Sequence, residues 1–175
     1  MLEAAVGTPV LGYRAPSFSI VPGREWALDV LVEEGYAYDS SLFPVARPGY
    51  GYPGGARGPH LLTSPAGTLV ELPPATVRRW GVTLPAAGGA YFRLLQDCER
   101  GKVPGTFYIH PWEVDTHQPR LRVSWPARIR HYGGLGRTVP RLERLLTEFR
   151  FNSVQGAGTV ARLLPCPLEA SAGCP

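Results

Sequence analysis

Glycine and proline limit the regular structure that this chain can form. The 175 residues include 21 glycines and 19 prolines, just under a quarter of the sequence, and these follow no repeating period. Because both residues weaken or break helix and strand interiors, the regular elements must be short and joined by many turns. With 44% hydrophobic and only 18% charged residues, the chain can still bury a core. The sequence therefore predicts a loop-rich globular domain.

Helix-like and strand-like segments alternate along the chain. Helical spacing or composition predicts helices over residues 2–6, 24–36, 88–101 and 139–149. Runs of β-forming residues predict strands over residues 10–13, 68–73 and 105–111 and a short strand within 36–44. Residues 44–67 are rich in Gly, Pro and Tyr without periodicity, and we expect a long loop there. This order predicts an α/β domain, with antiparallel strands as an alternative.

Finer expectations concern which residues face the core and which end the elements. Trp26, Val30 and Leu31 fall on one face of the helix within 24–36, so we expect that face to be buried. Gly35 should end this helix, because glycine readily adopts the left-handed conformation that follows a helix. Thr138 is the expected N-cap of the last helix. The strand over 10–13 is expected to be buried.

Charge and cysteine content bound the partners and the compartment. The net charge of +4 comes from scattered arginines, and solvated surface is the commonest role for such arginines. No recognition helix, RNA-binding signature or zinc finger accompanies them, so we expect no nucleic-acid partner. Three cysteines without C-x-x-C spacing (Cys98, Cys166 and Cys174) are expected to be free thiols in a reducing compartment. The sequence shows no signal peptide and no apolar run of about 18 residues, which predicts a cytoplasmic protein without a membrane span.

The stretch "FYIHPWEVD" holds the first candidate site residue. His110 ends a predicted strand, which Pro111 breaks, and in α/β folds strand ends build functional sites. Trp112, Glu113 and Asp115 crowd the loop that follows, a density of polar and aromatic groups that favours a site. The alternative is a core histidine with one hydrogen-bond partner.

Two further candidates precede this stretch. Asp39 follows a short strand and would make His110 a competent general acid by accepting its hydrogen bond. Alternatively, Asp39 forms an ordinary turn with Ser40 and Ser41. Arg14, in "GYRAPSFSI", could orient a carboxylate base through a bidentate contact, or it could form a structural ion pair. The remaining histidines lack the H-x-x-x-H spacing, so the sequence contains no complete metal site.

Taken together, several stretches resemble one enzyme family. "GYRAPSFSI", "WALDVLVEEGYAYDSSLFP", "AAGGAYFRLL", "FYIHPWEVDTHQPR" and "RHYGGLGRTVPRLERLL" are similar to the C-terminal part of the NodB-homology polysaccharide deacetylases. The closest resemblance is to the exopolysaccharide-locus branch, which carries an extra C-terminal domain of unknown function. The resemblance extends from about Leu2 to Phe151. The combination of "GYRAPSFSI" with "HPWEVDTHQPR", in this order and at this separation, is specific to the family.

The resemblance implies a fold and a reaction. The fold is an irregular (β/α) barrel, and the reaction is metal-assisted hydrolysis of an N-acetyl group on a sugar. In the family a divalent metal, usually zinc, is held by an aspartate and two histidines, polarises the acetyl carbonyl and activates a water. A second aspartate is the base, and a late histidine protonates the leaving amine.

Roles in such a site transfer to residues that match the family's motifs. Arg14 matches the arginine that orients the catalytic aspartate, Asp39 the partner of the catalytic histidine, and His110 the general acid itself. Pro16 and Ser17 match the segment of the substrate groove whose backbone amide stabilises the oxyanion. Trp112 matches an aromatic residue beside the catalytic histidine. Many relatives have an aromatic residue where Ser17 stands.

The family's first two motifs do not occur in this sequence. T-F-D-D supplies the base and one metal ligand, and H-[ST]-x-x-H supplies the other two ligands. From this we expect a truncated form with impaired or no activity, which does not bind the metal alone. We expect residues 1–151 to be a partial barrel without its N-terminal strands and residues 152–175 to be a flexible tail.

The resemblance also implies partners. N-acetylated polysaccharide is the expected substrate, and the strand edges of a partial barrel would promote self-association. The alternative function is a non-catalytic glycan-binding pseudoenzyme or scaffold, with Tyr50, Tyr52, Trp80 and Trp112 as stacking faces.

Overall fold

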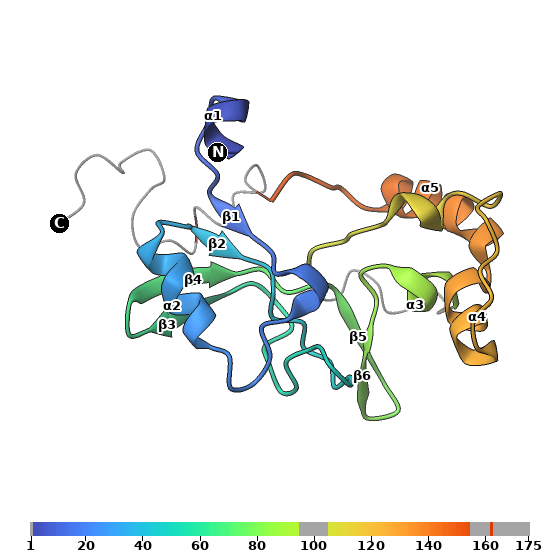
Figure 1. The fold of residues 1–175 in the computed structure, drawn as a ribbon, viewed down its shortest axis with the longest axis horizontal. Coiled ribbons are helices and arrows are strands. Elements are labelled where there is room, and N and C mark those ends of the chain that lie inside the picture. Colours follow the sequence, from blue (N-terminus) through green and yellow to red (C-terminus); the bar gives the residue numbers. More distant parts are fainter. Residues whose placement is uncertain (1, 95–104, 155–161, 163–175) are drawn as a thin grey trace.

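A four-stranded sheet forms one half of the fold (Figure 1). The computed structural model describes residues 2–94, 105–154 and 162. The strands lie in the order β1 (Gly12–Tyr13), β2 (Tyr38–Asp39), β4 (Gly67–Glu71) and β3 (His60–Ser64). β1, β2 and β4 are parallel, and β3 is antiparallel to β4. The parallel register places Tyr13, Asp39 and Glu71 side by side at the ends of three strands.

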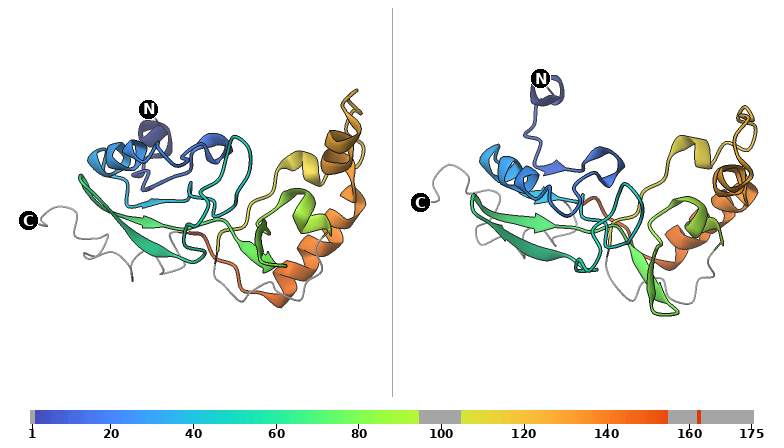
Figure 2. Two further views of the ribbon diagram at one scale, coloured as in Figure 1. Left: turned by 90° about the horizontal axis from the view of Figure 1, so that it is seen from below. Right: turned by 60° about the horizontal axis from the view of Figure 1, so that its bottom comes forward.

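Helix α2 (Trp26–Glu33) covers one face of this sheet (Figure 2). Leu28 and Leu31 of α2 are buried in the main apolar cluster, which also contains Leu42 and Leu69. The expected helix and its end are confirmed, since Gly35 follows it with φ +81°. The predicted buried face is only partly correct: Leu31 is buried, but Trp26 is 66% exposed and Val30 43% exposed.

The N-terminal segment agrees with the sequence in its helix and differs in its strand. Helix α1 (Leu2–Val6) forms where it was expected and ends at Gly7, whose φ is +72°. The strand predicted over 10–13 shortens to the two residues of β1 and is not buried, because Tyr13 is 37% exposed. It lies at an edge of the sheet, where only one neighbouring strand can cover it.

The other half of the fold contains a β-hairpin and three helices (Figures 1 and 2). Strands β5 (Thr76–Arg79) and β6 (Val82–Pro85) are antiparallel and joined through Trp80 and Gly81, which both have positive φ. Two residues with positive φ suit the tight turn of a two-residue hairpin. The helices are α3 (Gly89–Leu94), α4 (Trp125–Tyr132) and α5 (Thr138–Glu148).

Several expected elements need correction. Residues 60–64, inside the predicted loop 44–67, form strand β3. Residues 107–110, predicted as strand, have no regular structure; Thr106 makes an isolated bridge to Pro74. Helix α5 begins at Thr138, which is therefore not its N-cap: the N-cap is Arg137, and the Thr138 hydroxyl is buried without a hydrogen bond. The hairpin β5–β6 and helix α4 were not predicted.

The fold class is mixed α/β. The described strands form a four-stranded and a two-stranded sheet, and they do not close into a barrel. None of the described helices reaches the length and apolarity that a bilayer crossing requires. The three cysteines, residues 95–101 of the helix predicted over 88–101 and most of the expected tail lie outside the described residues.

Candidate functional site

A cleft of about 350 Å³ opens between the hairpin half of the fold and the loop that carries His110. Its wall combines aromatic rings with small residues such as Gly88, Gly89 and Ala90. The lining residues include Phe43, Tyr50, Gly88, Tyr91, Tyr108, His110, Trp112, Glu113, Val123, Arg130, His131 and Tyr132. Such a concave, aromatic surface with a few polar groups is typical of a ligand site.

The segment leading to His110 is held close to the hairpin half by its backbone. Tyr108 donates its N–H to the carbonyl of Ala87 at 2.9 Å. Its own carbonyl passes Gly88 so closely that a Cβ at Gly88 would lie 2.2 Å from the oxygen. Glycine at this position therefore permits the approach that forms one wall of the cleft. Burial raises the pKa of Tyr108 to about 12, so its hydroxyl stays protonated at neutral pH.

His110 lies at the start of the 3₁₀ turn η3 (Pro111–Glu113). Pro111 suits the first position of such a turn, where no N–H is needed. The turn brings Glu113 back onto His110: Glu113 Oε1 lies 3.3 Å from the backbone nitrogen and 3.2 Å from ring Nδ1. The imidazole is 55% exposed, whereas the Glu113 side chain is fully buried. Nδ1 is therefore occupied by a buried carboxylate, and the ring borders the cleft.

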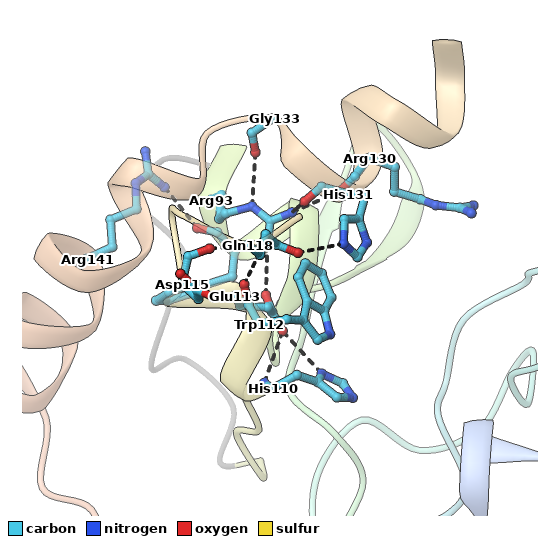
Figure 3. Close-up of polar contacts among 11 residues, drawn as sticks. Arg93, His110, Trp112, Glu113, Asp115, Gln118, Arg130, His131, Gly133 and Arg141 are labelled. Carbon is cyan, nitrogen blue, oxygen red and sulfur yellow. Dashed lines mark hydrogen bonds and ion pairs between the residues drawn. The ribbon is translucent and has the colours of Figure 1, made fainter. Parts of the chain in front are cut away.

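Arg93 of α3 pairs with the same carboxylate (Figure 3). Its Nη1 donates to Glu113 Oε2 at 2.9 Å, and both side chains are fully buried. The other nitrogens donate to the last carbonyls of α4 and to the one that follows: Arg130 at 2.8 Å, His131 at 3.1 Å and Gly133 at 3.0 Å. Burial lowers the pKa of Arg93, and the charge of Glu113 opposes this.

Trp112 lies between two imidazoles in Figure 3. Its ring stacks on His131 with centroids 4.1 Å apart and planes 12° apart, and the His110 ring centroid lies 6.0 Å away. Gln118 fixes this arrangement, since its amide nitrogen donates to the Trp112 carbonyl at 2.7 Å and its amide oxygen lies 3.1 Å from His131 Nε2. The indole is thus held among His131, His110 and Arg93, whose guanidinium lies 5.6 Å from the ring centroid.

Arg14 belongs to a second polar cluster, beneath the ends of the parallel strands. Its Nη2 donates to the hydroxyls of Ser40 at 2.7 Å and Thr106 at 2.8 Å, and its Nε donates to the Ser40 carbonyl. The guanidinium also lies within 6 Å of the Phe18 and Tyr108 ring centroids, at 5.9 and 5.7 Å. Within the described part of the chain, Arg14 makes neither of the predicted contacts, a bidentate carboxylate contact or an ion pair.

Asp39 does not pair with His110. Its two carboxylate oxygens accept from the hydroxyl of Ser41 at 2.6 Å and from the Ser41 N–H at 3.0 Å. This is the turn left open as the alternative, and no hydrogen bond joins Asp39 to His110 among the described residues. The predicted pairing is not formed: Asp39 is buried in strand β2 with Ser41 on both of its oxygens, and Glu113 lies against His110 Nδ1.

Glu71 is the second acid of this cluster. It is opposite Asp39 in the β2–β4 ladder, and it is also fully buried. Burial and the nearby charge of Asp39 raise the pKa of Glu71 to about 10, so Glu71 is protonated at neutral pH. Burial also raises the pKa of Asp39, against the hydrogen bonds from Ser41.

The predicted groove segment lies beside the clusters. Pro16 and Ser17 begin the turn η1 (Pro16–Phe18); both are exposed, and neither lines the 350 Å³ cleft. Ser17 and Phe18 have positive φ, which is uncommon for residues other than glycine. Phe18 packs against Phe43 and Tyr108, with ring centroids 4.8 and 5.5 Å away, so the turn supports the cleft wall.

The structure thus divides the six predicted residues among three places. His110 and Trp112 share the cleft, Arg14 and Asp39 share the buried cluster, and Pro16 and Ser17 lie on an exposed turn. Sequence reasoning missed other members: Arg93, Glu71, Gln118 and His131. For Arg93 and Glu71 there was a signal, a charge inside the apolar runs "YFRLL" and "TLVELP". Buried charges are rare unless paired or neutralised.

The described residues do not fit the metal that the family resemblance implies. In residues 2–94, 105–154 and 162, no group of three or more His, Cys, Asp or Glu side chains has the geometry to hold a metal ion. Asp39 is engaged with Ser41, and Glu113 is engaged with Arg93 and His110.

Comparison with known proteins gives one match. No curated protein and no solved structure is significantly similar to this chain. Residues 40–159 match the sequence profile of a family described as a domain of unknown function, DUF3473. This range includes the cleft, the histidine turn and Glu71, and it covers more than half of the chain. The chain therefore belongs to the DUF3473 family.

Proposed function

We propose that this chain is a polysaccharide deacetylase-like protein that binds N-acetylated exopolysaccharide in the aromatic cleft. DUF3473 is in general associated with polysaccharide deacetylase-like exopolysaccharide proteins. The resemblance of the stretches around Arg14, Asp39 and His110 to the deacetylases supports the same assignment. The single observation that carries the proposal is the half-exposed His110 imidazole, which borders the cleft while a buried carboxylate holds its Nδ1.

This geometry suits a general acid in amide hydrolysis. When water adds to an acetamido carbon and the C–N bond breaks, the leaving sugar amine must gain a proton. His110 can donate this proton from Nε2, because Nδ1 is already engaged with Glu113. The imidazolium form of His110 must be present before the transfer.

The cleft wall suits a sugar. Tyr50, Tyr91 and Tyr132 line it together with Trp112. Flat aromatic faces pack against the C–H surfaces of sugar rings, and phenol hydroxyls can bind sugar hydroxyls. Arg47 donates a hydrogen bond to the Tyr91 hydroxyl and so fixes one side of this wall.

The proposed role of Arg14 is to orient the catalytic carboxylate. Its Nη1 makes no hydrogen bond within the described residues, while Nε and Nη2 are anchored on Ser40 and Thr106. The deacetylase motifs that supply the base and the metal ligands do not occur in these 175 residues. We therefore expect little or no turnover by this chain alone.

The test uses oligomers of N-acetylglucosamine. Isothermal titration should show saturable binding, which Tyr50→Ala weakens about 10-fold because a cleft aromatic is lost. Acetate release, measured with zinc present, should be low and should be lost in His110→Ala. Absence of binding in the wild-type protein would contradict the proposal, and turnover unaffected by His110→Ala would contradict the role of His110.

A non-catalytic glycan-binding protein is the second candidate. The observation that favours it is the same aromatic cleft, together with the lack of a metal-holding group among the described residues. Trp80 offers a further ring, 82% exposed with Arg79 against it. Saturable binding without any acetate release, with zinc present, would select this function.

A further inference from the structure

We propose that Glu113, held by Arg93, is the positioning residue that sets the tautomer and orientation of the His110 imidazole. This inference rests on the proposed function only where it concerns turnover; the tautomer of His110 does not depend on it. The assignment differs from the sequence expectation, in which Asp39 was the partner. Neither Glu113 nor Arg93 contacts the reacting atoms in this account; both act through His110.

The tautomer of His110 follows from its contact with Glu113. A single oxygen, Glu113 Oε1, accepts from both the backbone N–H and ring Nδ1–H of His110, at 3.3 and 3.2 Å. A carboxylate only accepts hydrogen bonds, and the Glu113 N–H is directed to the His110 carbonyl at 2.9 Å, so we assign the ring proton to Nδ1. The remaining nitrogen, Nε2, is then the one that gains or loses a proton.

The Glu113 carboxylate is itself held in one position. Glu113 is fully buried, and Arg93 binds its other oxygen, Oε2, at 2.9 Å. Arg93 is itself fixed by three carbonyls at the end of α4, from Arg130, His131 and Gly133. Glu113 therefore cannot rotate away from His110 without leaving a buried guanidinium unpaired.

In the part of the chain that the structure describes, no other carboxylate bonds to His110. Both oxygens of Asp39 are occupied by Ser41. The other ring neighbours of His110 are Tyr108, edge-on at 5.5 Å, and Trp112 at 6.0 Å. Among the described residues, Glu113 is thus the only carboxylate bonded to this imidazole.

Substitution by glutamine gives a specific spectroscopic prediction. In Glu113→Gln we expect the amide oxygen to face Arg93, because the buried guanidinium only donates; this orientation gives up the longer, 3.3 Å bond from the His110 backbone N–H. The amide NH₂ then faces His110, so Nδ1 must accept and the proton moves to Nε2. The substitution should therefore exchange the tautomer of the neutral imidazole while the side chain keeps its size.

The experiment is ¹⁵N NMR of the histidine ring nitrogens in the full chain at alkaline pH, where imidazole is neutral. Wild-type His110 should show protonated Nδ1, whereas neutral histidine in water favours protonated Nε2. Glu113→Gln should show protonated Nε2. Asp39→Asn, which removes the charge of the rival partner, should leave the wild-type tautomer, as should Glu148→Gln on the exposed face of α5.

Protonated Nε2 in the wild-type protein would overturn the inference, even if the variants fail to fold. So would an unchanged tautomer in Glu113→Gln or a changed one in Asp39→Asn. Where acetate release is measurable, Glu113→Gln should lower kcat by ~10²-fold with little change in KM. An absence of sugar binding would contradict the proposed function and leave the tautomer result intact, so the two failures are distinguishable.

Discussion

Asp39 and Glu71 face each other across the β2–β4 ladder, and both carboxyl groups are fully buried. Ionising both buried acids would be costly in free energy. Burial and the charge of Asp39 therefore raise the pKa of Glu71 to about 10. Asp39 keeps the better hydrogen bonds, from Ser41. This pair makes stability depend on pH in a direction that can be predicted.

The free energy of unfolding should fall as pH rises, because the buried Glu71 carboxyl group ionises less readily in the folded than in the unfolded protein. An unfolded glutamic acid titrates near its ordinary pKa of 4.5, and the folded one near 10. The stability that the protonated form contributes is complete below pH 4.5 and is lost progressively up to pH 10. Glu71→Gln removes this loss and should increase the free energy of unfolding at neutral pH by about 2 kcal/mol.

Urea unfolding at acidic and mildly alkaline pH checks this prediction. The difference between Glu71→Gln and wild type should grow as pH increases, while Glu33→Gln, an exposed change on α2, should give a constant difference. A difference that stays constant or shrinks with increasing pH would contradict a raised pKa of Glu71 in the folded protein.

The buried pair of Arg93 and Glu113 should be important for stability. Arg93→Met leaves Glu113 buried without its cation and three carbonyls without their donors, so we expect a loss of about 3–5 kcal/mol. The matched control is Arg144→Met, which breaks the exposed pair with Glu148 on α5 and should cost about 0.5 kcal/mol. Equal losses in the two variants, measured by chemical unfolding, would contradict the importance of the buried pair.

Gly88 should tolerate no side chain. In Gly88→Ala the new methyl group would lie 2.2 Å from the Tyr108 carbonyl oxygen, so the cleft wall must shift. We expect a loss of about 2 kcal/mol and weaker oligosaccharide binding. Gly136→Ala is the control, since a Cβ there meets nothing within 4 Å. Thermal unfolding of both variants tests the difference, and an unaffected Gly88→Ala protein would mean that this approach is not tight.

Self-association through the sheet edge stays a prediction. Strand β3 lies at one edge of the four-stranded sheet, and its Leu61 is 37% exposed. Unpaired strand edges favour pairing between chains. Light scattering should show a mass that rises with concentration and a smaller rise in Leu61→Lys. A monomer at all concentrations would exclude this mode.

The sequence predicted the elements with clear boundaries. Helix α2 and its end at Gly35 follow from apolar spacing and the glycine. Its buried face was harder to predict, because apolar residues occupy most positions of "WALDVLVE". The choice of face depends on Leu42 and Leu69, which come from elsewhere in the chain.

Two missed elements have local explanations. Helix α4 carries a proline in its first turn, where proline is tolerated, but no helix was predicted there. Strand β3 has few β-branched residues and lies within a Gly- and Pro-rich region. Pairing with β4 stabilises it, and such long-range pairing is not visible in local composition.

The sequence predicted which residues border the cleft better than it predicted which residues bond to one another. His110 and Trp112 do border a cleft, as the crowded "HPWE" stretch suggested. The partner of His110 was assigned to Asp39, some seventy residues away, whereas the actual carboxylate is three residues away. A 3₁₀ turn brings positions i and i+3 together, so the local sequence contained this information.

The most direct test of the central claim is an NMR titration of the His110 ring signals with tetrameric N-acetylglucosamine. We predict saturable shifts of the His110 and Trp112 ring signals, with smaller shifts when the fully deacetylated tetramer is used. Unchanged ring signals, or equal responses to both tetramers, would contradict a site for N-acetylated polysaccharide in this cleft.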